Sequence, residues 1–105
     1  MLSPLDATLK INREDALVVD VRTQDDFMGG HIVGARHIPL AELEKRAPEL
    51  EKLQPRPVIL CCQSGSRSAN AVAILRKAGI GQVFNLRGGV MEWERAGLPL
   101  ARGRK

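Results

Sequence analysis

The sequence predicts an α/β fold, a three-layer sandwich in which helices flank a central, mostly parallel sheet. Three observations support this prediction. Continuous apolar runs at residues 17–21 and 57–62 are typical of parallel strands that are buried on both faces. Apolar residues at helical spacing lie between the second run and a third, less pure run at residues 82–86. Glycine and proline mark the short connections, so strands alternate with helices.

The first predicted strand, at residues 17–21, is followed later in the chain by a helical region that contains a proline. Its apolar positions recur at helical spacing: Leu40, Leu43, Ala47, Leu50 and Leu53. Pro48 has no amide proton and would break a continuous helix. We therefore expect two short helices, with Pro48 near the start of the second, where proline is tolerated.

The second half of the chain predicts a strand, helix, strand unit of parallel type, followed by a last helix. After the strand at residues 57–62, helical spacing is kept by Ala71, Ile74, Leu75 and Ala78. Gly79 marks the end of this helix. After the strand at residues 82–86, residues 88–96 predict a final helix that is closed by Gly97 and Pro99.

Length and composition limit the function classes. The 105 residues suit one domain, which we place at residues 1–105. Aromatic residues make up only 3%, too few for the stacking surface of a single-strand nucleic-acid binder. The net charge of +4 owes much to the tail (Arg102, Arg104 and Lys105), so we expect no nucleic-acid partner. We find no membrane-span or signal-peptide pattern, and we expect a cytoplasmic protein with no membrane partner. We expect it to be a monomer or a weak homodimer.

The two cysteines, Cys61 and Cys62, are adjacent in the sequence. Such a pair does not cross-link distant segments and does not have the spacing of zinc ligands, so we expect no metal. His31 and His37 have no carboxylate or thiol around them at ligand spacing, and we expect both to be structural. The cysteines therefore direct attention to thiol chemistry.

The segment from Cys62 to Ser68 leaves a predicted buried strand and enters a helix, the place where ligands collect in an open α/β sheet. A short loop with Gly65 can turn several backbone N–H groups toward one point and form an anion site at the start of the helix. Arg67 adds a positive charge nearby. We expect this environment to lower the pKa of Cys62. The alternative is that Cys62 merely fills the end of a buried strand.

Four motifs occur in order along the chain: Asp20-Val21-Arg22, the block from Phe27 to Pro39, the loop from Cys62 to Ser68, and Leu86-Arg87-Gly88-Gly89 with Trp93, Gly97, Leu98 and Pro99. The second block contains Gly30-His31-Ile32-Val33-Gly34-Ala35 and ends in Ile38-Pro39. Together these motifs resemble a single-domain rhodanese, a sulfurtransferase module. The resemblance covers nearly the whole chain and implies the rhodanese-like fold, a three-layer α/β sandwich. It also implies a central, mostly parallel sheet of about five strands, which is the usual size of a sheet.

The resemblance implies that Cys62 is the catalytic residue, which takes a sulfane sulfur from a donor such as thiosulfate and becomes a persulfide. The sulfur then passes to cyanide or to a thiol, for example that of a thioredoxin-like protein. Substrate binding is assigned to the rest of the loop: Gln63, Ser64, Gly65, Ser66, Arg67 and Ser68. Asp20 and Arg22 are expected to brace the loop, and no cofactor or metal is implied. Because a thiol loses nucleophilicity as its pKa falls, we expect the loop donors to act mainly on the anionic substrate and on the charge of the transition state and persulfide.

Several alternatives stay open at this point. The loop has neutral Ser64 and Ser66 where thiosulfate-preferring members can place cations, so polysulfide and a protein persulfide are alternative donors. Cys61 stands where the family often has an aromatic residue, and we expect it to fill the strand end. The alternative is that Cys61 takes the sulfur from Cys62 or is oxidised together with it. A phosphatase loop has five residues between cysteine and arginine, a spacing that fits Cys61 rather than Cys62. The third alternative is a binding or regulatory module.

Overall fold

The three strands expected from the apolar runs lie side by side in one parallel sheet. The computed structural model describes residues 1–103. The sheet has the strand order β3-β1-β4-β5, and every neighbouring pair is parallel. Its strands are β1 (Leu17–Asp20), β3 (Arg36–His37), β4 (Val58–Cys61) and β5 (Val83–Asn85). The α/β prediction with a parallel central sheet is thus confirmed, with four strands in place of about five.

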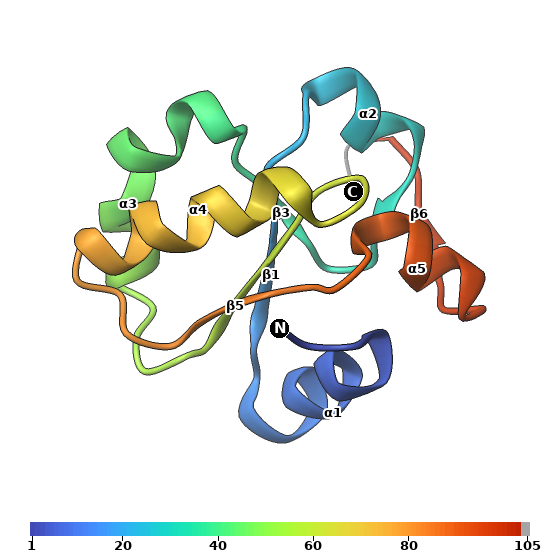
Figure 1. Ribbon diagram of the computed structural model, residues 1–105, viewed down its shortest axis with the longest axis horizontal. Coiled ribbons are helices and arrows are strands. Elements are labelled where there is room, and N and C mark those ends of the chain that lie inside the picture. The colour runs from blue at the N-terminus through green and yellow to red at the C-terminus, as the bar shows by residue number, and fades with distance from the viewer. Residues whose placement is uncertain (104–105) are drawn as a thin grey trace.

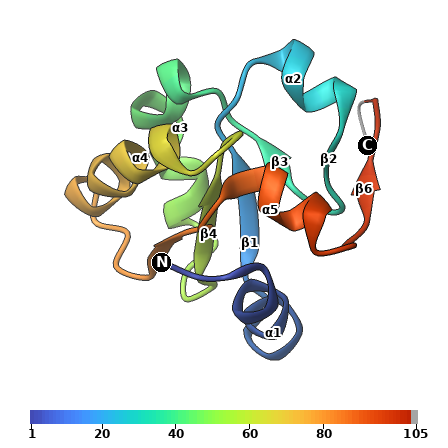
Figure 2. The ribbon, with the colours of Figure 1, turned by 45° about the vertical axis from the view of Figure 1, so that its right-hand side comes forward.

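Two further strands form a small separate sheet. β2 (His31–Ile32) pairs antiparallel with β6 (Leu100–Ala101), and Figure 2 shows this pair beside α5 (Gly89–Arg95). A single parallel bridge joins Leu2 to Leu86, the residue that follows β5. These pairings are too short to leave an apolar run, which is why the strand count could not be read from periodicity.

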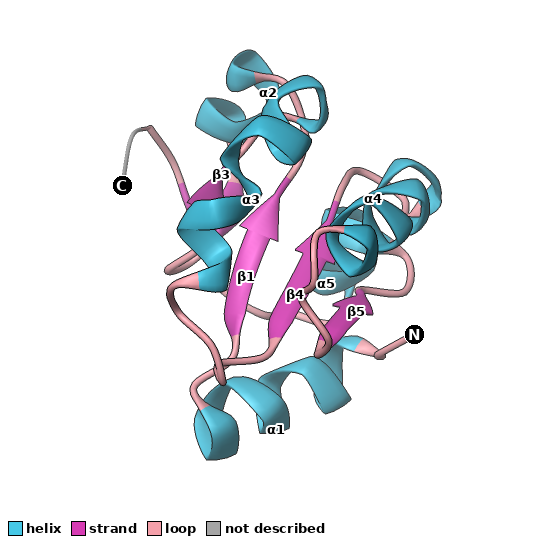
Figure 3. Cartoon of the chain, turned by 90° about the vertical axis from the view of Figure 1, so that its left-hand side faces the viewer, coloured by secondary structure: helices cyan, strands magenta, loops and turns pink. Residues whose placement is uncertain are grey.

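Helices cover both faces of the parallel sheet and complete the three layers (Figures 1 and 3). One buried cluster joins the sheet to α3 (Leu43–Glu51) and α4 (Ser66–Lys77). A second buried cluster joins the opposite face to α1 (Pro4–Glu14) and α5. The shorter α2 (Gln24–Gly29) and the 3₁₀ turn η1 (Leu40–Glu42) lie in the connections between strands.

The alternation of side chains along each strand decides which face they join. On β1, Leu17 and Val19 pack with α3 and α4, whereas Val18 packs with α1 and α5. On β4, Leu60 faces the first cluster and Ile59 the second. Both faces are therefore buried, which explains why the strands read as continuous apolar runs.

Pro48 is placed differently from the sequence prediction. It lies inside α3 and not near its start, and the segment before α3 is the turn η1 rather than a first α-helix. Pro48 removes one intrahelical hydrogen bond, a cost of about 3 kcal/mol in a helix interior. Leu43, Ala47 and Leu50 on the other side of α3 are fully or almost fully buried against the sheet, and this packing outweighs the local cost.

Two helices were not expected from the sequence. α1 begins after Ser3, whose side chain accepts a hydrogen bond from the amide of Asp6. α2 begins after Thr23, which caps the amide of Asp26 in the same way. Within residues 1–103, no helix combines the length and apolar character needed to cross a membrane. Arg104 and Lys105 of the basic tail lie outside the described residues.

Candidate active site

The predicted loop follows β4 at the carboxyl edge of the parallel sheet. Cys62 comes directly after the last residue of β4, and α4 begins at Ser66. Gly65 occupies the position before α4 with a left-handed backbone (φ 99°), a conformation that glycine adopts without strain. This turn reverses the chain within a few residues, so the loop folds back over the thiol that precedes it.

Three groups that can donate a hydrogen bond lie around the sulfur of Cys62. The amide of Gly65 lies 3.1 Å from Sγ and the amide of Ser68 lies 3.4 Å from it. The Ser68 hydroxyl lies 3.3 Å from Sγ. The loop therefore has the geometry of the anion site expected from its sequence, with the Cys62 sulfur at its centre.

Burial and hydrogen bonding act in opposite directions on Cys62. Burial of the thiol raises its pKa, because the charged form is desolvated. Hydrogen bonds from the Ser68 side chain and from the amides of Ser68, Gly65 and Ser64 lower it, and their combined effect is larger. The pKa of Cys62 is consequently lower than that of an ordinary thiol, which favours the thiolate.

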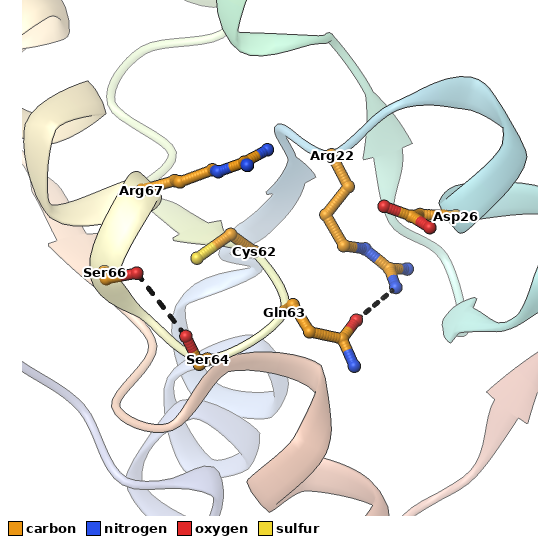
Figure 4. A pocket seen from close by; sticks show the side chains of 7 residues that line it. All are labelled: Arg22, Asp26, Cys62, Gln63, Ser64, Ser66 and Arg67. Carbon is orange, nitrogen blue, oxygen red and sulfur yellow. Dashed lines mark hydrogen bonds between the residues drawn. The ribbon is translucent and has the colours of Figure 1, made fainter.

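A pocket of about 340 Å³ opens over the thiol (Figure 4). Its lining consists of Arg22, Asp26, Cys62, Gln63, Ser64, Ser66 and Arg67. Arg67 approaches from the start of α4, while Arg22 and Asp26 lie on the opposite side of Cys62. A small anion in this pocket would meet two guanidinium groups, two serine hydroxyls and one carboxylate.

Arg22 connects the loop to two other parts of the chain. Its guanidinium forms an ion pair of 2.8 Å with the fully buried Asp20 at the end of β1. It also donates to the carbonyl of Gly30 (2.7 Å) and to the side-chain oxygen of Gln63 (3.1 Å). Asp20 and Arg22, which the sequence suggested as supports, thus reach the loop through Gln63.

The start of α5 lies against the back of the loop. The amides of Val90 and Met91 donate to the carbonyls of Cys62 (2.9 Å) and Gln63 (3.1 Å). A Cβ atom at Gly89 would lie 2.3 Å from the Cys62 carbonyl oxygen, so this approach requires glycine. These contacts hold the carbonyls of Cys62 and Gln63 toward α5, while the amides of Gly65 and Ser68 contact the sulfur.

Comparison with known proteins decides the family. The Rhodanese-like domain family model matches residues 3–96. The protein belongs to the rhodanese-like domain family. It is 44% identical to the uncharacterized protein YibN of Escherichia coli strain K12 over 94% of this chain and 70% of YibN. It is 42% identical to a protein of Allochromatium vinosum named sulfurtransferase, over 83% of this chain and 79% of that one. A rhodanese-related protein of Thermoplasma volcanium superposes with a TM-score of 0.83 at 29% identity, covering 95% of each chain.

In this rhodanese-like domain, Cys61 and Cys62 have separate surroundings. Cys61 is fully buried in the cluster that contains α1 and α5, on the other face of the sheet from the cluster that Cys62 joins. Burial raises the pKa of Cys61 well above that of an ordinary thiol. Because Cys61 does not line the pocket, a phosphatase loop that uses Cys61 as nucleophile is not supported by the geometry.

The rhodanese-like site also contains Asn85, a residue that the sequence analysis did not single out. Asn85 is the last residue of β5 and is 6% exposed. Its amide nitrogen donates to the carbonyl of Gly65 (3.0 Å), and its side-chain oxygen accepts a hydrogen bond from the Ser68 hydroxyl. The sequence feature that could have pointed to Asn85 is its place as a polar residue inside the apolar run at residues 82–86.

The two histidines of the rhodanese-like domain are placed by packing. His31 is buried, stacks on Phe27 with a centroid separation of 3.8 Å, and bonds to the carbonyl of that residue. His37 stacks on the other side of Phe27 and bonds to the carbonyl of Arg22. Among residues 1–103, no three Cys, His, Asp or Glu side chains are grouped as ligands of a metal ion.

Proposed function

We propose that this protein is a sulfurtransferase in which Cys62 carries the transferred sulfur as a persulfide. The observation that carries the proposal is the convergence of the Gly65 and Ser68 amides and the Ser68 hydroxyl on Sγ of Cys62, under a pocket with two arginines. The sulfurtransferase name of the relative from Allochromatium vinosum supports the same class of reaction. An inert strand-end cysteine would have no need of donors aimed at its sulfur.

In the first step, the Cys62 thiolate attacks the outer sulfur of thiosulfate. A bond forms between Sγ and this sulfane sulfur, the S–S bond of thiosulfate breaks, and sulfite leaves with the bonding electron pair. The negative charge moves to the outer sulfur of the new persulfide. Amide donors fixed by the backbone stabilise this charge without reorganisation, which is how a preorganised anion site contributes to catalysis.

In the second step, a nucleophile attacks the outer sulfur of the persulfide. With cyanide, a carbon–sulfur bond forms, the Cys62 thiolate leaves with the electron pair, and thiocyanate is released. A thiolate acceptor takes the sulfur in the same way and becomes a persulfide itself. The lowered pKa of Cys62 makes it a good leaving group in this step.

Charge in the pocket favours an anionic donor. Arg67 is exposed at the entrance and Arg22 lies deeper, braced by Asp20, so an oxyanion such as the sulfonate end of thiosulfate meets positive charge from two sides. The neutral hydroxyls of Ser64 and Ser66, both exposed, add hydrogen-bond donors to the pocket lining. Polysulfide and protein persulfides are the alternative donors. The acceptor is cyanide or a thiol, including a protein thiol of the thioredoxin-like type, in the cytoplasm.

The decisive experiment is the intact mass of the protein after incubation with thiosulfate. The wild type is expected to gain one sulfur atom and to lose it again on addition of cyanide, with thiocyanate formed in equal amount. Cys62→Ser is expected to gain no sulfur. Cys61→Ser is the matched control, because it removes the neighbouring thiol but leaves the pocket unchanged, and it is expected to gain sulfur like the wild type.

Each contrary result has a distinct meaning. Sulfur retained in Cys62→Ser and lost in Cys61→Ser would overturn the assignment of the nucleophile. Sulfur gained from polysulfide but not from thiosulfate would keep the persulfide and reject the donor. Hydrolysis of a phosphate ester that depends on Cys61, with no gain of sulfur, would favour a phosphatase. The absence of all these activities would overturn the proposal in favour of a binding module.

A further inference from the structure

The Ser68 hydroxyl has one proton and three acceptors within reach. Its oxygen lies 3.3 Å from Sγ of Cys62 and 3.4 Å from the carbonyl oxygen of Gly65, and it is also hydrogen-bonded to the side-chain oxygen of Asn85. A hydroxyl donates only one hydrogen bond at a time. The three acceptors therefore compete for this one hydrogen bond. The stability of the Cys62 thiolate depends on which of them receives it.

The orientation of the Asn85 amide is fixed by its second partner. Its nitrogen lies 3.0 Å from the Gly65 carbonyl oxygen, which can only accept. A flipped amide would place two acceptors against each other at this contact. The Asn85 oxygen must therefore face Ser68, and because that oxygen also only accepts, the proton between the two residues belongs to Ser68.

We propose that Asn85 is a positioning residue that draws the Ser68 hydroxyl proton away from Cys62 and so keeps the thiolate from being stabilised further. With Cys62 as the neutral thiol, the hydrogen bonds form a continuous chain, from the sulfur to the Ser68 oxygen and from Ser68 to the Asn85 oxygen. When Cys62 ionises, Ser68 turns its proton toward the sulfur and the Asn85 oxygen loses its donor. The inference rests on the proposed role of Cys62 as nucleophile.

Restraint of this kind has a chemical use. The nucleophilicity of a thiolate falls as its pKa falls, with a Brønsted coefficient of about 0.4–0.5, and the best attacking thiol has a pKa near the ambient pH. The backbone amides of Gly65 and Ser68 are needed to stabilise the transferred charge and cannot be withdrawn. The Ser68 hydroxyl is the one donor of the three whose direction another side chain can set.

The charged groups facing Cys62 come from three elements. Arg22 follows β1, Asp26 belongs to α2 and Arg67 belongs to α4, and all three line the pocket. The thiol of Cys61 precedes Cys62 on β4, on the opposite face of the sheet. The variants described below leave all four groups unchanged, so a shift in the titration of Cys62 reports on Ser68 and Asn85.

The test is the rate of alkylation of Cys62 by iodoacetamide as a function of pH, with the modified residue identified by fragment mass spectrometry. Asn85→Leu keeps the approximate size of the side chain and removes its acceptor. The pKa of Cys62 is expected to fall by about one unit, the value of one hydrogen bond to a charged group. The plateau rate constant at high pH is expected to fall about threefold, because the more stabilised thiolate is the weaker nucleophile.

Two comparisons make the result specific. In a Ser68→Ala background, Asn85→Leu is expected to leave the pKa of Cys62 unchanged, because no hydroxyl proton is left to redirect. Asn70→Leu on the exposed side of α4 is the matched control and is expected to produce no shift. Asn85→Ala is measured in parallel. Because it only removes atoms, it controls for steric clashes that the leucine side chain could introduce.

The sign of the shift separates this role from simple bracing of the loop. If Asn85 only holds Gly65 in place, its loss loosens the amide donors and the pKa of Cys62 rises. A rise, or no change, in a variant whose thermal melting still shows a cooperative fold would overturn the inference. Alkylation does not require sulfur transfer, so this experiment is independent of the persulfide measurement. A failure of the sulfurtransferase proposal would appear only in the persulfide measurement.

Discussion

Cys61 and Cys62 are neighbours in the sequence, yet the pleat of the strand sends them to opposite faces of the sheet. Cys61 enters the cluster of α1 and α5, where burial raises the pKa of its thiol. Cys62 leaves the end of β4, where loop amides bond to its sulfur and lower its pKa. The difference shows that strand alternation, by sending one thiol into the core and the other to the hydrogen-bond donors of the loop, gives two neighbouring cysteines opposite pKa shifts.

The largest expected contrast is in alkylation. At neutral pH, Cys61 in a Cys62→Ala protein is expected to react with iodoacetamide about a thousandfold more slowly than Cys62 in a Cys61→Ala protein, since exposure of Cys61 requires an opening that costs about 4 kcal/mol or more. The rate for Cys62 is expected to rise with pH to a plateau, because only the thiolate reacts. The midpoint of this rise gives the pKa of Cys62, which is expected to lie below that of a free thiol. Similar rates for the two thiols would remove the basis of the comparison.

The next effect concerns the buried ion pair between Arg22 and Asp20, which supports the Cys62 loop. Arg22→Met leaves the fully buried carboxylate of Asp20 without its ion-pair partner and is expected to lower the free energy of unfolding by about 3–5 kcal/mol. Urea unfolding measures this. The matched variant Arg46→Met breaks ion pairs at the surface of α3 and is expected to cost less than about 1 kcal/mol. Equal costs would show that Arg22 is not a structural brace.

A third effect tests the contact between α5 and the loop. Gly89→Ala adds a Cβ atom 2.3 Å from the Cys62 carbonyl at a residue with φ of +58°. We expect a loss of about 2–3 kcal/mol in the free energy of unfolding, because the contacting atoms are backbone and cannot move aside cheaply. Gly81→Ala is the control, since its Cβ would meet nothing within 4 Å. An unchanged free energy of unfolding in Gly89→Ala would mean that the close contact with α5 does not hold the Cys62 loop in its conformation.

The smallest effect concerns Arg67 at the pocket entrance. Arg67→Gln removes one positive charge without disturbing the core and is expected to reduce kcat/KM for thiosulfate about tenfold at low salt, with thermal stability almost unchanged. Steady-state kinetics at several salt concentrations check this, because screening weakens the charge effect. Lys77→Gln at the other end of α4 serves as control. An equal loss in both variants would point to the overall charge of the protein.

The sequence allowed the buried part of the fold to be predicted, because strands covered on both faces leave continuous apolar runs. The pairings of β2 and β6, two residues each, leave no such trace. Pro48 was misplaced because local propensity gave it a helix start, whereas packing of Leu43, Ala47 and Leu50 against the sheet carries α3 through it. Tertiary contacts decided each of these cases, and they are not present in local periodicity.

The candidate site divides in the same way. The loop could be found because glycine, arginine and serine stand in a short segment directly after a buried strand. Asn85 could not be assigned, because its partners Ser68 and Gly65 lie about 20 residues earlier in the chain and meet it only through the register of β4 and β5. The same holds for the Arg22–Gln63 contact, whose members are separated by 41 positions.

This separation along the chain has a consequence for biosynthesis. Parallel strands cannot pair as local hairpins, so the sheet assembles only after each crossover helix has been made, and folds of this kind form slowly. Until β5 has joined β4, neither Asn85 nor the bulk of α5 is in place behind the loop. A chain emerging from the ribosome therefore carries two adjacent, unprotected thiols of ordinary acidity, which acquire their separate characters only when the last third of the sequence has been synthesised.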